Sequence, residues 1–313
     1  MLTQKHKIVI LDAITLGDDV DLDIFKELTK VIIYQKTSKE DTIKHIDDAT
    51  IVITNKVIID KHTIDNTNIK LICVAATGMN NIDLEYAKQK EIVVKNVIGY
   101  STASVAQLTF AIALEFIQNI PYFDNYVKNL DWTKSEIFTN VSKPFYELQD
   151  KTWGIIGLGN IGERVANIAT AFGANIQYYS TSNTNRNTNY NRVSLEEILK
   201  TSDIISIHSP LNPKTLNLIN RSNIPLIKDK TIILNLGRGG IVNEDDIADI
   251  LDKREIYYGT DVISQEPIPK DSSLLKVVNK NRLIITPHIA WASKEARTRL
   301  VNSIKQNIKD FIL

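Results

Sequence analysis

The sequence contains a single cysteine, Cys73, among its 313 residues. An intramolecular disulfide needs two cysteines and a cysteine-based zinc site needs several, so both are excluded. This low usage is typical of a reducing compartment, and we expect a cytoplasmic protein. Because Cys73 lies in the apolar run KLICVAATG, we expect an inert residue on a buried strand rather than a nucleophile.

An excess of either charge is also missing, because lysine plus arginine and aspartate plus glutamate number 37 each. A neutral total argues against a protein-wide field that attracts nucleic acid or anionic membranes, although a local positive patch is compatible with it. No apolar run approaches the ~20 residues that span a bilayer. The basic and then apolar N-terminus is interrupted by Asp12, so we expect a strand over residues 7–11 rather than a signal peptide. We expect neither a nucleic-acid nor a membrane partner.

Short β-branched runs alternate with helical stretches along most of the chain. The runs are continuously apolar, as expected for strands that are buried on both faces of a parallel sheet. The length suggests two domains, at about 150 residues for each. We therefore expect an α/β protein with two doubly wound parallel-sheet domains. The predicted strands lie in two series: 7–11, 30–34, 50–54, 69–75 and 91–97, then 151–157, 175–180, 203–208, 231–237, 256–262 and 282–288.

The boundary between the two series is predicted near residues 99–101. There Ser101 or Thr102 can cap a long helix, which should end or bend at Pro121. Near the C-terminus Ser293 can cap a helix whose apolar residues recur at helical spacing, so one of its faces needs a partner. We expect this helix to pack on the first domain and to make that domain discontinuous. The predicted division is 1–99 plus 289–313 for one domain and 100–288 for the other.

The stretch WGIIGLGNIGERVANI contains the pattern G-x-G-x-x-G at Gly157, Gly159 and Gly162. An apolar run precedes it and helical spacing follows, which favours a dinucleotide-binding turn over an ordinary strand-to-helix turn. The first glycine permits the tight turn, the second lets the backbone approach a pyrophosphate, and the third lets helix and strand pack closely. The helix N-terminus, with Asn160 and Ile161, would stabilise the phosphate charge.

About 20 residues later, NAD-binding folds present a carboxylate to the ribose hydroxyls. By strand register this position is Ser180, which begins the polar segment STSNTNRNTNYNR. We predict an exposed loop there, followed by a helix that a capping box at Ser194 and Glu197 begins. Hydroxyl and amide groups, with Arg186, could bind the 2′-phosphate of NADP. Alternatively Ser180 bonds the ribose and NAD is used, so NAD and NADP both stay open.

Charged residues follow three later strands, at the edge where parallel sheets bind ligands. Arg238 lies among glycines in NLGRGG. Its guanidinium could bind a carboxylate, or it could be a solvated side chain on a flexible turn, and the residues favour neither alternative. Asp261 and Glu266 follow the next strand, and His288 follows Pro287. A lone histidine is more often structural, which we expect of the others: His6, His45, His62 and His208 are predicted to be structural or solvent-facing.

The motifs GLGNIG, NLGRGG, DVISQEP and TPHIAW occur here in the order and spacing of a known family. On these motifs the chain resembles the D-isomer-specific 2-hydroxyacid dehydrogenases over essentially its full length. The resemblance implies a flavodoxin-like substrate domain, discontinuous in sequence, and a Rossmann-like cofactor domain inserted into it. It further implies a small 2-keto or 2-hydroxy acid as substrate, no metal, and a homodimer, for which the helix after Ser101 is either a contact or simply part of the core.

The resemblance also implies roles for individual residues. Arg238, Glu266 and His288 match the catalytic arginine, glutamate and histidine. Arg238 would fix the substrate carboxylate and stabilise charge on the carbonyl oxygen. His288 would exchange the proton with that oxygen while Glu266 orients its ring. The remaining matches bind ligands: Leu236, Gly237 and Asp261 the cofactor, with Asp261 on the nicotinamide carboxamide, and Thr77, Gly78 and Trp291 the substrate.

Within the family, TPHIAWASKEAR and VITNKV most resemble the glycerate dehydrogenase or hydroxypyruvate reductase branch. This implies reduction of hydroxypyruvate or glyoxylate to D-glycerate or glycolate. Trp291 would limit the pocket, or else pack at the hinge between the domains. Two alternatives are a formate dehydrogenase, which Glu266 opposes because that group pairs its histidine with glutamine, and a nucleotide-binding regulatory protein of the corepressor type.

Overall fold

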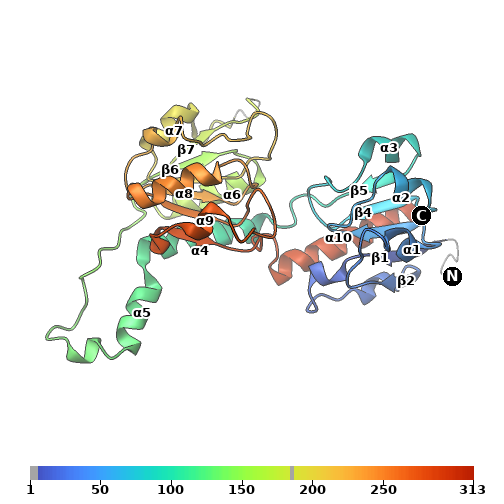
Figure 1. Ribbon diagram of the computed structural model, residues 1–313, viewed down its shortest axis with the longest axis horizontal. Coiled ribbons are helices and arrows are strands. Elements are labelled where there is room, and N and C mark those ends of the chain that lie inside the picture. Colours follow the sequence, from blue (N-terminus) through green and yellow to red (C-terminus); the bar gives the residue numbers. More distant parts are fainter. Residues whose placement is uncertain (1–5, 184–186) are drawn as a thin grey trace. The chain divides into compact units, whose positions relative to one another are not determined.

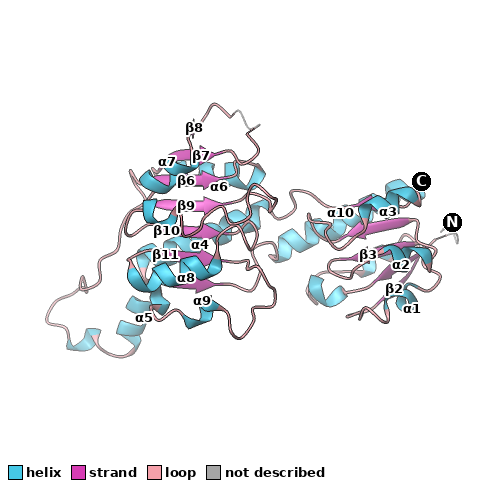
Figure 2. Ribbon diagram, turned by 45° about the horizontal axis from the view of Figure 1, so that its top comes forward, coloured by secondary structure: helices cyan, strands magenta, loops and turns pink. Residues whose placement is uncertain are grey.

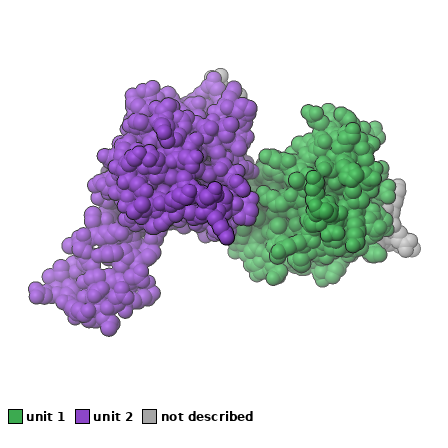
Figure 3. All heavy atoms as spheres, in the orientation of Figure 1, with its two compact units in different colours: residues 1–101, 291–313 green, residues 102–290 purple. Residues whose placement is uncertain are grey.

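The computed structural model describes residues 6–183 and 187–313. The chain divides into two compact units, which are coloured separately in Figure 3. Unit 1 comprises residues 1–101 and 291–313, and unit 2 comprises residues 102–290. The chain passes from unit 1 to unit 2 after residue 101 and returns after residue 290, in each case two residues later than predicted.

Local contacts explain where the crossovers lie. Tyr100 packs edge-on against Trp291 with 6.3 Å between ring centroids, and its carbonyl accepts a hydrogen bond from Arg299 Nε at 3.0 Å. These contacts keep Tyr100 with unit 1. Ala290 stays with unit 2, because its N–H donates to Asp261 and its carbonyl accepts from Ser104 Oγ.

Unit 1 contains a five-stranded parallel sheet in the order β2-β1-β3-β4-β5 (Figure 1). This is the flavodoxin-like order. The strands are β1 (Lys7–Ile10), β2 (Lys30–Ile33), β3 (Ile51–Thr54), β4 (Leu71–Val74) and β5 (Val93–Lys95). Its short helical elements are η1 (Ala13–Leu16), η2 (Asp23–Phe25), α1 (Thr42–Ile46), α2 (Lys61–Asp65) and α3 (Leu84–Gln89). Cys73 is buried on β4, where burial raises the pKa of its thiol to about 12.

The helix α10 (Lys294–Ile312) completes the core of unit 1. Ser293 caps it, because its hydroxyl accepts a hydrogen bond from the Ala296 N–H at 3.2 Å. One face is apolar at helical spacing and packs against inward side chains of β1, β3 and β4. That face consists of Ala296, Leu300, Val301, Ile304 and Ile308. Unit 1 is thus discontinuous, as the sequence predicted.

Unit 2 contains a seven-stranded parallel sheet in the order β12-β11-β10-β9-β6-β7-β8, which can be followed from β8 to β11 in Figure 2. The chain runs outward in both directions from β6 and β9, so the topological switch point of a Rossmann-like sheet lies between them. The strands are β6 (Thr152–Ile156), β7 (Asn175–Tyr179), β8 (Asn191–Arg192), β9 (Ile204–Ile207), β10 (Ile232–Asn235), β11 (Tyr257–Thr260) and β12 (Leu283–Ile285).

Helices cover both faces of this sheet. On β6, Ile155 packs against α4 (Thr102–Gln118) and α6 (Asn160–Ala171). Its neighbour Ile156 belongs to the opposite layer with α7 (Leu195–Thr201), α8 (Glu244–Lys253) and α9 (Ser273–Lys276). Because successive strand residues face opposite sides, both must be apolar, which explains the continuous apolar runs. The remaining short elements are η3 (Trp132–Lys134), η4 (Ile224–Leu226) and η5 (Lys280–Arg282).

The segment predicted as an exposed loop after β7 differs from that prediction at both ends. Ser180 is buried, and β8 pairs with β7 in parallel, with Tyr178 opposite Arg192. The prediction was wrong for β8 because a two-residue polar strand carries no apolar period. Arg186 lies outside the described residues.

After α4 the chain turns at Asn119, which has a φ of +53°, into α5 (Ile120–Lys128) with Pro121 in its first turn. This is the predicted bend. Of the described helices, none alone has the length and apolar composition of a bilayer span, and α4 and α5 meet both criteria only as a pair bent by 57°. We call residues 120–147 the arm; it runs away from the sheet of unit 2 (Figure 1). Large apolar side chains are exposed along it: Ile120, Val127, Leu130, Trp132, Ile137, Phe138, Val141 and Phe145.

Candidate active site

The glycine turn connects β6 to α6 at the switch point of the sheet. Gly157 has a φ of +92°, and a Cβ there would lie 2.9 Å from the backbone nitrogen of Ser209. A Cβ at Gly162 would overlap the Gly157 carbonyl oxygen, so the helix can approach the turn only without one. Gly159 is the N-cap of α6 and supplies no side-chain cap, and nothing lies within 4 Å of a Cβ built on it. The N–H groups of the first helical turn thus have no side-chain cap, and such groups suit a phosphate.

Buried polar atoms beside this turn have no hydrogen-bond partner among the described residues: both ring nitrogens of His208 and the hydroxyl of Ser209. These residues follow β9, the strand across the switch point from β6. Burial lowers the pKa of His208 to about 3, so its ring is neutral. An unpaired buried hydroxyl costs free energy, which a polar ligand at the switch point would recover. The residues present therefore fit a dinucleotide.

Ser180 directly follows β7, as the strand register predicted, and is only 5% exposed. The structure also places Arg192 on β8, beside β7, where its guanidinium donates to the Asn183 side chain. The sequence analysis did not select Arg192, because no sequence signal marks β8 as a strand.

His288 and Glu266 are in direct contact. The distance from His288 Nδ1 to Glu266 Oε2 is 2.7 Å, and Glu266 Oε1 accepts a hydrogen bond from the Ile263 N–H at 3.2 Å. An ionised carboxylate can only accept hydrogen bonds, so Nδ1 is the donor in this pair. The other ring nitrogen, Nε2, is left to exchange a proton with a ligand. Both side chains are partly exposed, at 29% for His288 and 35% for Glu266.

Asp261 holds the segment that carries His288. Its Oδ1 accepts hydrogen bonds from Thr286 Oγ1 at 2.6 Å and from the Ile289 N–H at 2.8 Å, and its Oδ2 accepts from the Ala290 N–H at 2.8 Å. His288 has a φ of +54°, a conformation that is strained for a residue with a Cβ and persists only where neighbours enforce it. Burial raises the pKa of Asp261, and these hydrogen bonds oppose that rise. The sequence analysis missed Thr286, although a polar residue at the end of an apolar strand was a usable signal.

Arg238 follows β10 on a turn held by Asn235. The Asn235 side chain donates to the Arg238 carbonyl at 2.9 Å and accepts from the Gly237 N–H at 3.2 Å. Arg238 is exposed, and its Nη1 donates to the Gly237 carbonyl at 2.8 Å. Asn235 is 1% exposed and was not selected from the sequence, although it interrupts the apolar run of a predicted strand. Leu236 and Gly237 are buried in the same turn.

The strands β10, β11 and β12 are neighbours in the sheet. Arg238, Glu266 and His288 follow their C-terminal ends and so belong to one edge. The structure brings Glu266 and His288 into contact and places Arg238 after the adjacent strand. Among the described residues, no three or more histidine, cysteine or acidic side chains are grouped as metal ligands.

Comparison with known proteins identifies the family of the chain. Residues 110–290, nearly the whole of unit 2, match the NAD binding domain of the D-isomer specific 2-hydroxyacid dehydrogenases. A hydroxypyruvate reductase from Blautia hydrogenotrophica is 38% identical, covering 98% of this chain and 97% of its own. The chain belongs to the D-isomer-specific 2-hydroxyacid dehydrogenase family. It is therefore an oxidoreductase that uses a nicotinamide coenzyme.

Further relatives place the chain within the family. A glycerate dehydrogenase from Methylorubrum extorquens is 34% identical, covering 89% of this chain and 88% of its own. The crystal structure of a D-lactate dehydrogenase from Aquifex aeolicus, complexed with NAD and lactic acid, has a TM-score of 0.81 and 27% identity. It covers 98% of this chain and 95% of that chain. The predicted family, its glycerate dehydrogenase or hydroxypyruvate reductase branch and the fold are thus confirmed.

Apart from Arg238, the residues matched to substrate binding lie in unit 1. Thr77 and Gly78 follow β4, and the Thr77 hydroxyl donates to the Val97 carbonyl at 3.0 Å. The Asn96 side chain donates to the Thr77 carbonyl at 2.6 Å, so this loop is held at two points. Trp291 is half-buried against Tyr100 at the crossover. The substrate-binding roles of these residues stay predictions.

Proposed function

We propose that this dehydrogenase reduces hydroxypyruvate and glyoxylate, giving D-glycerate and glycolate. The 2.7 Å contact between His288 Nδ1 and Glu266 Oε2, at the ligand edge of the NAD-binding unit, carries the proposal. The substrate class is supported by the relatives named hydroxypyruvate reductase and glycerate dehydrogenase, at 38% and 34% identity.

The proposed chemistry assigns each strand-end residue one task. A bound reduced nicotinamide supplies a hydride to C2 of the keto acid, and negative charge develops on the carbonyl oxygen. Arg238 binds the carboxylate of the substrate and stabilises that charge. His288 Nε2 gives its proton to the oxygen, while Glu266 accepts the hydrogen bond from Nδ1 and orients the ring. In the oxidation direction the neutral ring removes the same proton.

Two further roles in the proposal come from the family resemblance alone: Thr77 and Gly78 would bind the substrate carboxylate, and Trp291 would limit the substrate to small keto acids. For the coenzyme we propose that both NADH and NADPH are accepted. The support is Ser180, because a carboxylate at this position would repel the 2′-phosphate of NADPH and a serine does not.

The test is a spectrophotometric assay with hydroxypyruvate, glyoxylate, pyruvate and a bulky keto acid, each with NADH and with NADPH. We expect the highest kcat/KM for hydroxypyruvate or glyoxylate. If the coenzyme binds but no keto acid is reduced, the protein is instead a coenzyme-binding regulatory protein. A preference for the bulky acid would contradict the substrate assignment.

Replacing His288 tests the mechanism. His288→Ala should lower turnover by roughly 10²–10⁴-fold, because general acid–base catalysis contributes about that much. Coenzyme affinity, measured by fluorescence titration, should change little. His62→Ala, which replaces an exposed histidine of unit 1, is the control and should keep wild-type turnover. Wild-type turnover in His288→Ala would remove His288 from the mechanism.

We further propose a cytoplasmic homodimer in which a second copy covers the arm. The support is the exposed apolar surface of residues 120–147, where no residue of α5 is buried and Phe138 is 88% exposed. A large apolar surface of this kind is characteristic of interfaces between protein chains. The single buried cysteine suits a reducing compartment.

A further inference from the structure

Glu244, the first residue of α8, binds the turn that leads to Glu266. Its Oε1 accepts a hydrogen bond from the Ser264 N–H at 2.6 Å, and its Oε2 accepts from Ser264 Oγ at 2.9 Å. Both carboxylate oxygens are thus used on one residue of the neighbouring loop. One residue earlier, the Ile263 N–H donates to Glu266 Oε1, whose other oxygen contacts His288. Glu244 is thus linked to the His288 ring by hydrogen bonds at Ser264, Ile263 and Glu266, with the covalent backbone joining residues 263 and 264.

The loop that carries Arg238 also contacts the turn that leads to Glu266, through the backbones of both. Gly239 directly follows Arg238, and a Cβ on Gly239 would overlap the Ile263 carbonyl group and the Ser264 nitrogen. The Arg238 turn therefore lies against the peptide bond that Glu244 binds. The absence of a side chain on Gly239 leaves room for this peptide in the place where Glu244 binds it.

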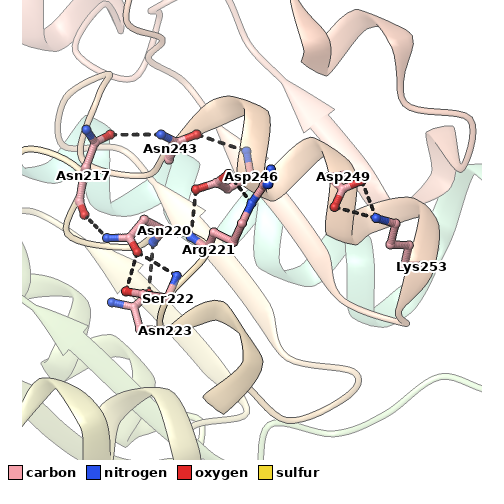
Figure 4. Close-up of polar contacts among 9 residues, drawn as sticks. All are labelled: Asn217, Asn220, Arg221, Ser222, Asn223, Asn243, Asp246, Asp249 and Lys253. Atoms are coloured by element: carbon pink, nitrogen blue, oxygen red, sulfur yellow. Dashed lines mark hydrogen bonds and ion pairs between the residues drawn. The ribbon is translucent and has the colours of Figure 1, made fainter.

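The N-terminus of α8 is itself fixed, as Figure 4 shows. Asn243 caps the helix by accepting from the Asp246 N–H at 3.0 Å, and its amide donates to the Asn217 side chain at 3.3 Å. Asp246 accepts hydrogen bonds from the backbone N–H of Arg221 at 2.7 Å and from its Nε at 3.1 Å. Glu244 thus extends from an anchored helix terminus toward a loop.

We propose that Glu244 is a positioning residue for the catalytic pair. It holds the 263–266 turn so that Glu266 stays in line with His288 Nδ1, and it acts on the reaction only through Glu266. This inference rests on the proposed function of His288 and Glu266. Residues 264–267 are exposed, so this loop has little core packing of its own to fix it. The contact between Glu244 and Ser264 supplies that restraint.

A simpler role for Glu244 is to complement the dipole of α8. Acidic side chains stabilise the first turn of a helix, and this turn also contains Asp245 and Asp246. Asp245 is exposed and, within the described part of the chain, its side chain makes no hydrogen bond. It offers the same charge at the same helix end without the contact to Ser264, which makes Asp245→Ala a matched control.

The test compares four proteins in the keto-acid assay: wild type, Glu244→Ala, Glu244→Gln and Asp245→Ala. We expect Glu244→Ala to lower kcat by roughly 10- to 100-fold, because displacing a reacting group by about 1 Å costs up to that much. KM should change little. Glu244→Gln, which can still accept from the Ser264 N–H, should restore most of kcat. Asp245→Ala should match the wild type.

A second comparison separates positioning from a general loss of structure. In a Glu266→Gln background, Glu244→Ala should lower kcat no further, because its effect passes through Glu266. Wild-type kcat in Glu244→Ala would overturn the inference. So would an equal loss in both backgrounds accompanied by a lower Tm, which would assign Glu244 to helix stability. Failure of the wild-type protein to reduce any keto acid would instead overturn the proposed function.

Discussion

Two histidines at strand ends of unit 2 have opposite surroundings. His288 is partly exposed and shares a hydrogen bond with Glu266, so its charged form has a partner. Both ring nitrogens of His208 are buried, and neither has a partner among the described residues. In the proposed mechanism, the first arrangement serves proton exchange. The second makes the stability of the protein depend on pH.

The pH dependence follows from the sign of the His208 shift. Its pKa in the folded protein is about 3, below the ordinary value of 6.5, so the unfolded chain binds the proton more readily. The contribution of neutral His208 to the free energy of unfolding is therefore fully present above pH 6.5 and is lost as the pH falls toward 3. Over that window the free energy of unfolding should fall by up to ~1.4 kcal/mol for each pH unit through this residue alone.

Urea unfolding of the coenzyme-free protein between pH 7 and pH 4.5, followed by circular dichroism, would measure this slope. His208→Leu should reduce it and should be at least as stable as the wild type at low pH, since two unpartnered nitrogens disappear. The exposed His62→Ala serves as the control with an unchanged slope. Parallel curves for wild type and His208→Leu would show that His208 is protonated in the folded state.

Among single residues, the sequence identified those that belong to motifs and missed those whose role depends on a contact with another residue. Arg238 and His288 belong to short patterns that can be read along the chain. Asn235 and Glu244 owe their positions to contacts with Arg238 and Ser264 that exist only in the folded loops. Asn235 still carried a signal, because a polar residue inside an apolar strand must find a hydrogen bond.

At the scale of elements, buried strands were the most predictable. Each of the eleven predicted strands contains an observed one, because layers on both faces require apolar side chains at most positions of the inner strands. Only β8 was missed. Helix starts were also predictable where a side chain caps the helix, as at Ser194 and Ser293.

The cap of α7 gives a stability prediction. The Ser194 hydroxyl accepts a hydrogen bond from the Glu197 N–H at 3.1 Å, and α7 buries Ile198 and Leu199 against the sheet. Ser194→Ala should lower the free energy of unfolding by about 1 kcal/mol. Ser194→Asp keeps an acceptor at the cap and should remain within a few tenths of a kcal/mol of the wild type. Equal midpoints in urea for all three proteins would mean that water replaces the cap without loss.

At the scale of the whole molecule, the strand orders came from the family resemblance rather than from apolar periodicity, which places strands without ordering them. The crossovers were harder to place, because the hydrogen bonds of Asp261 and Ser104 to Ala290 join residues far apart in sequence. The arm was not predicted either. Its apolar residues look, in sequence, like residues of a core.

The proposed homodimer predicts how the arm responds to charge. Phe138→Asp combined with Val141→Asp should convert a dimer into a monomer of 35.3 kDa in sedimentation equilibrium, because each carboxylate would be desolvated in the interface. Val278→Asp, at a residue that is 78% exposed on unit 2 outside the arm, should leave the dimer intact. A wild-type protein that already sediments as a monomer would contradict the proposal.

The discontinuity of unit 1 has a consequence for biosynthesis. The strands β1 to β5 leave the ribosome first, but the helix that covers their face with Ile8, Ile10, Ile51 and Ile53 is α10. About 190 residues of unit 2 are translated in between, which takes roughly 10–40 s at typical rates of synthesis. During this interval the nascent sheet of unit 1 exposes an apolar surface. Unit 2 can therefore fold before unit 1 is complete, and chaperones can bind the exposed surface on the growing chain.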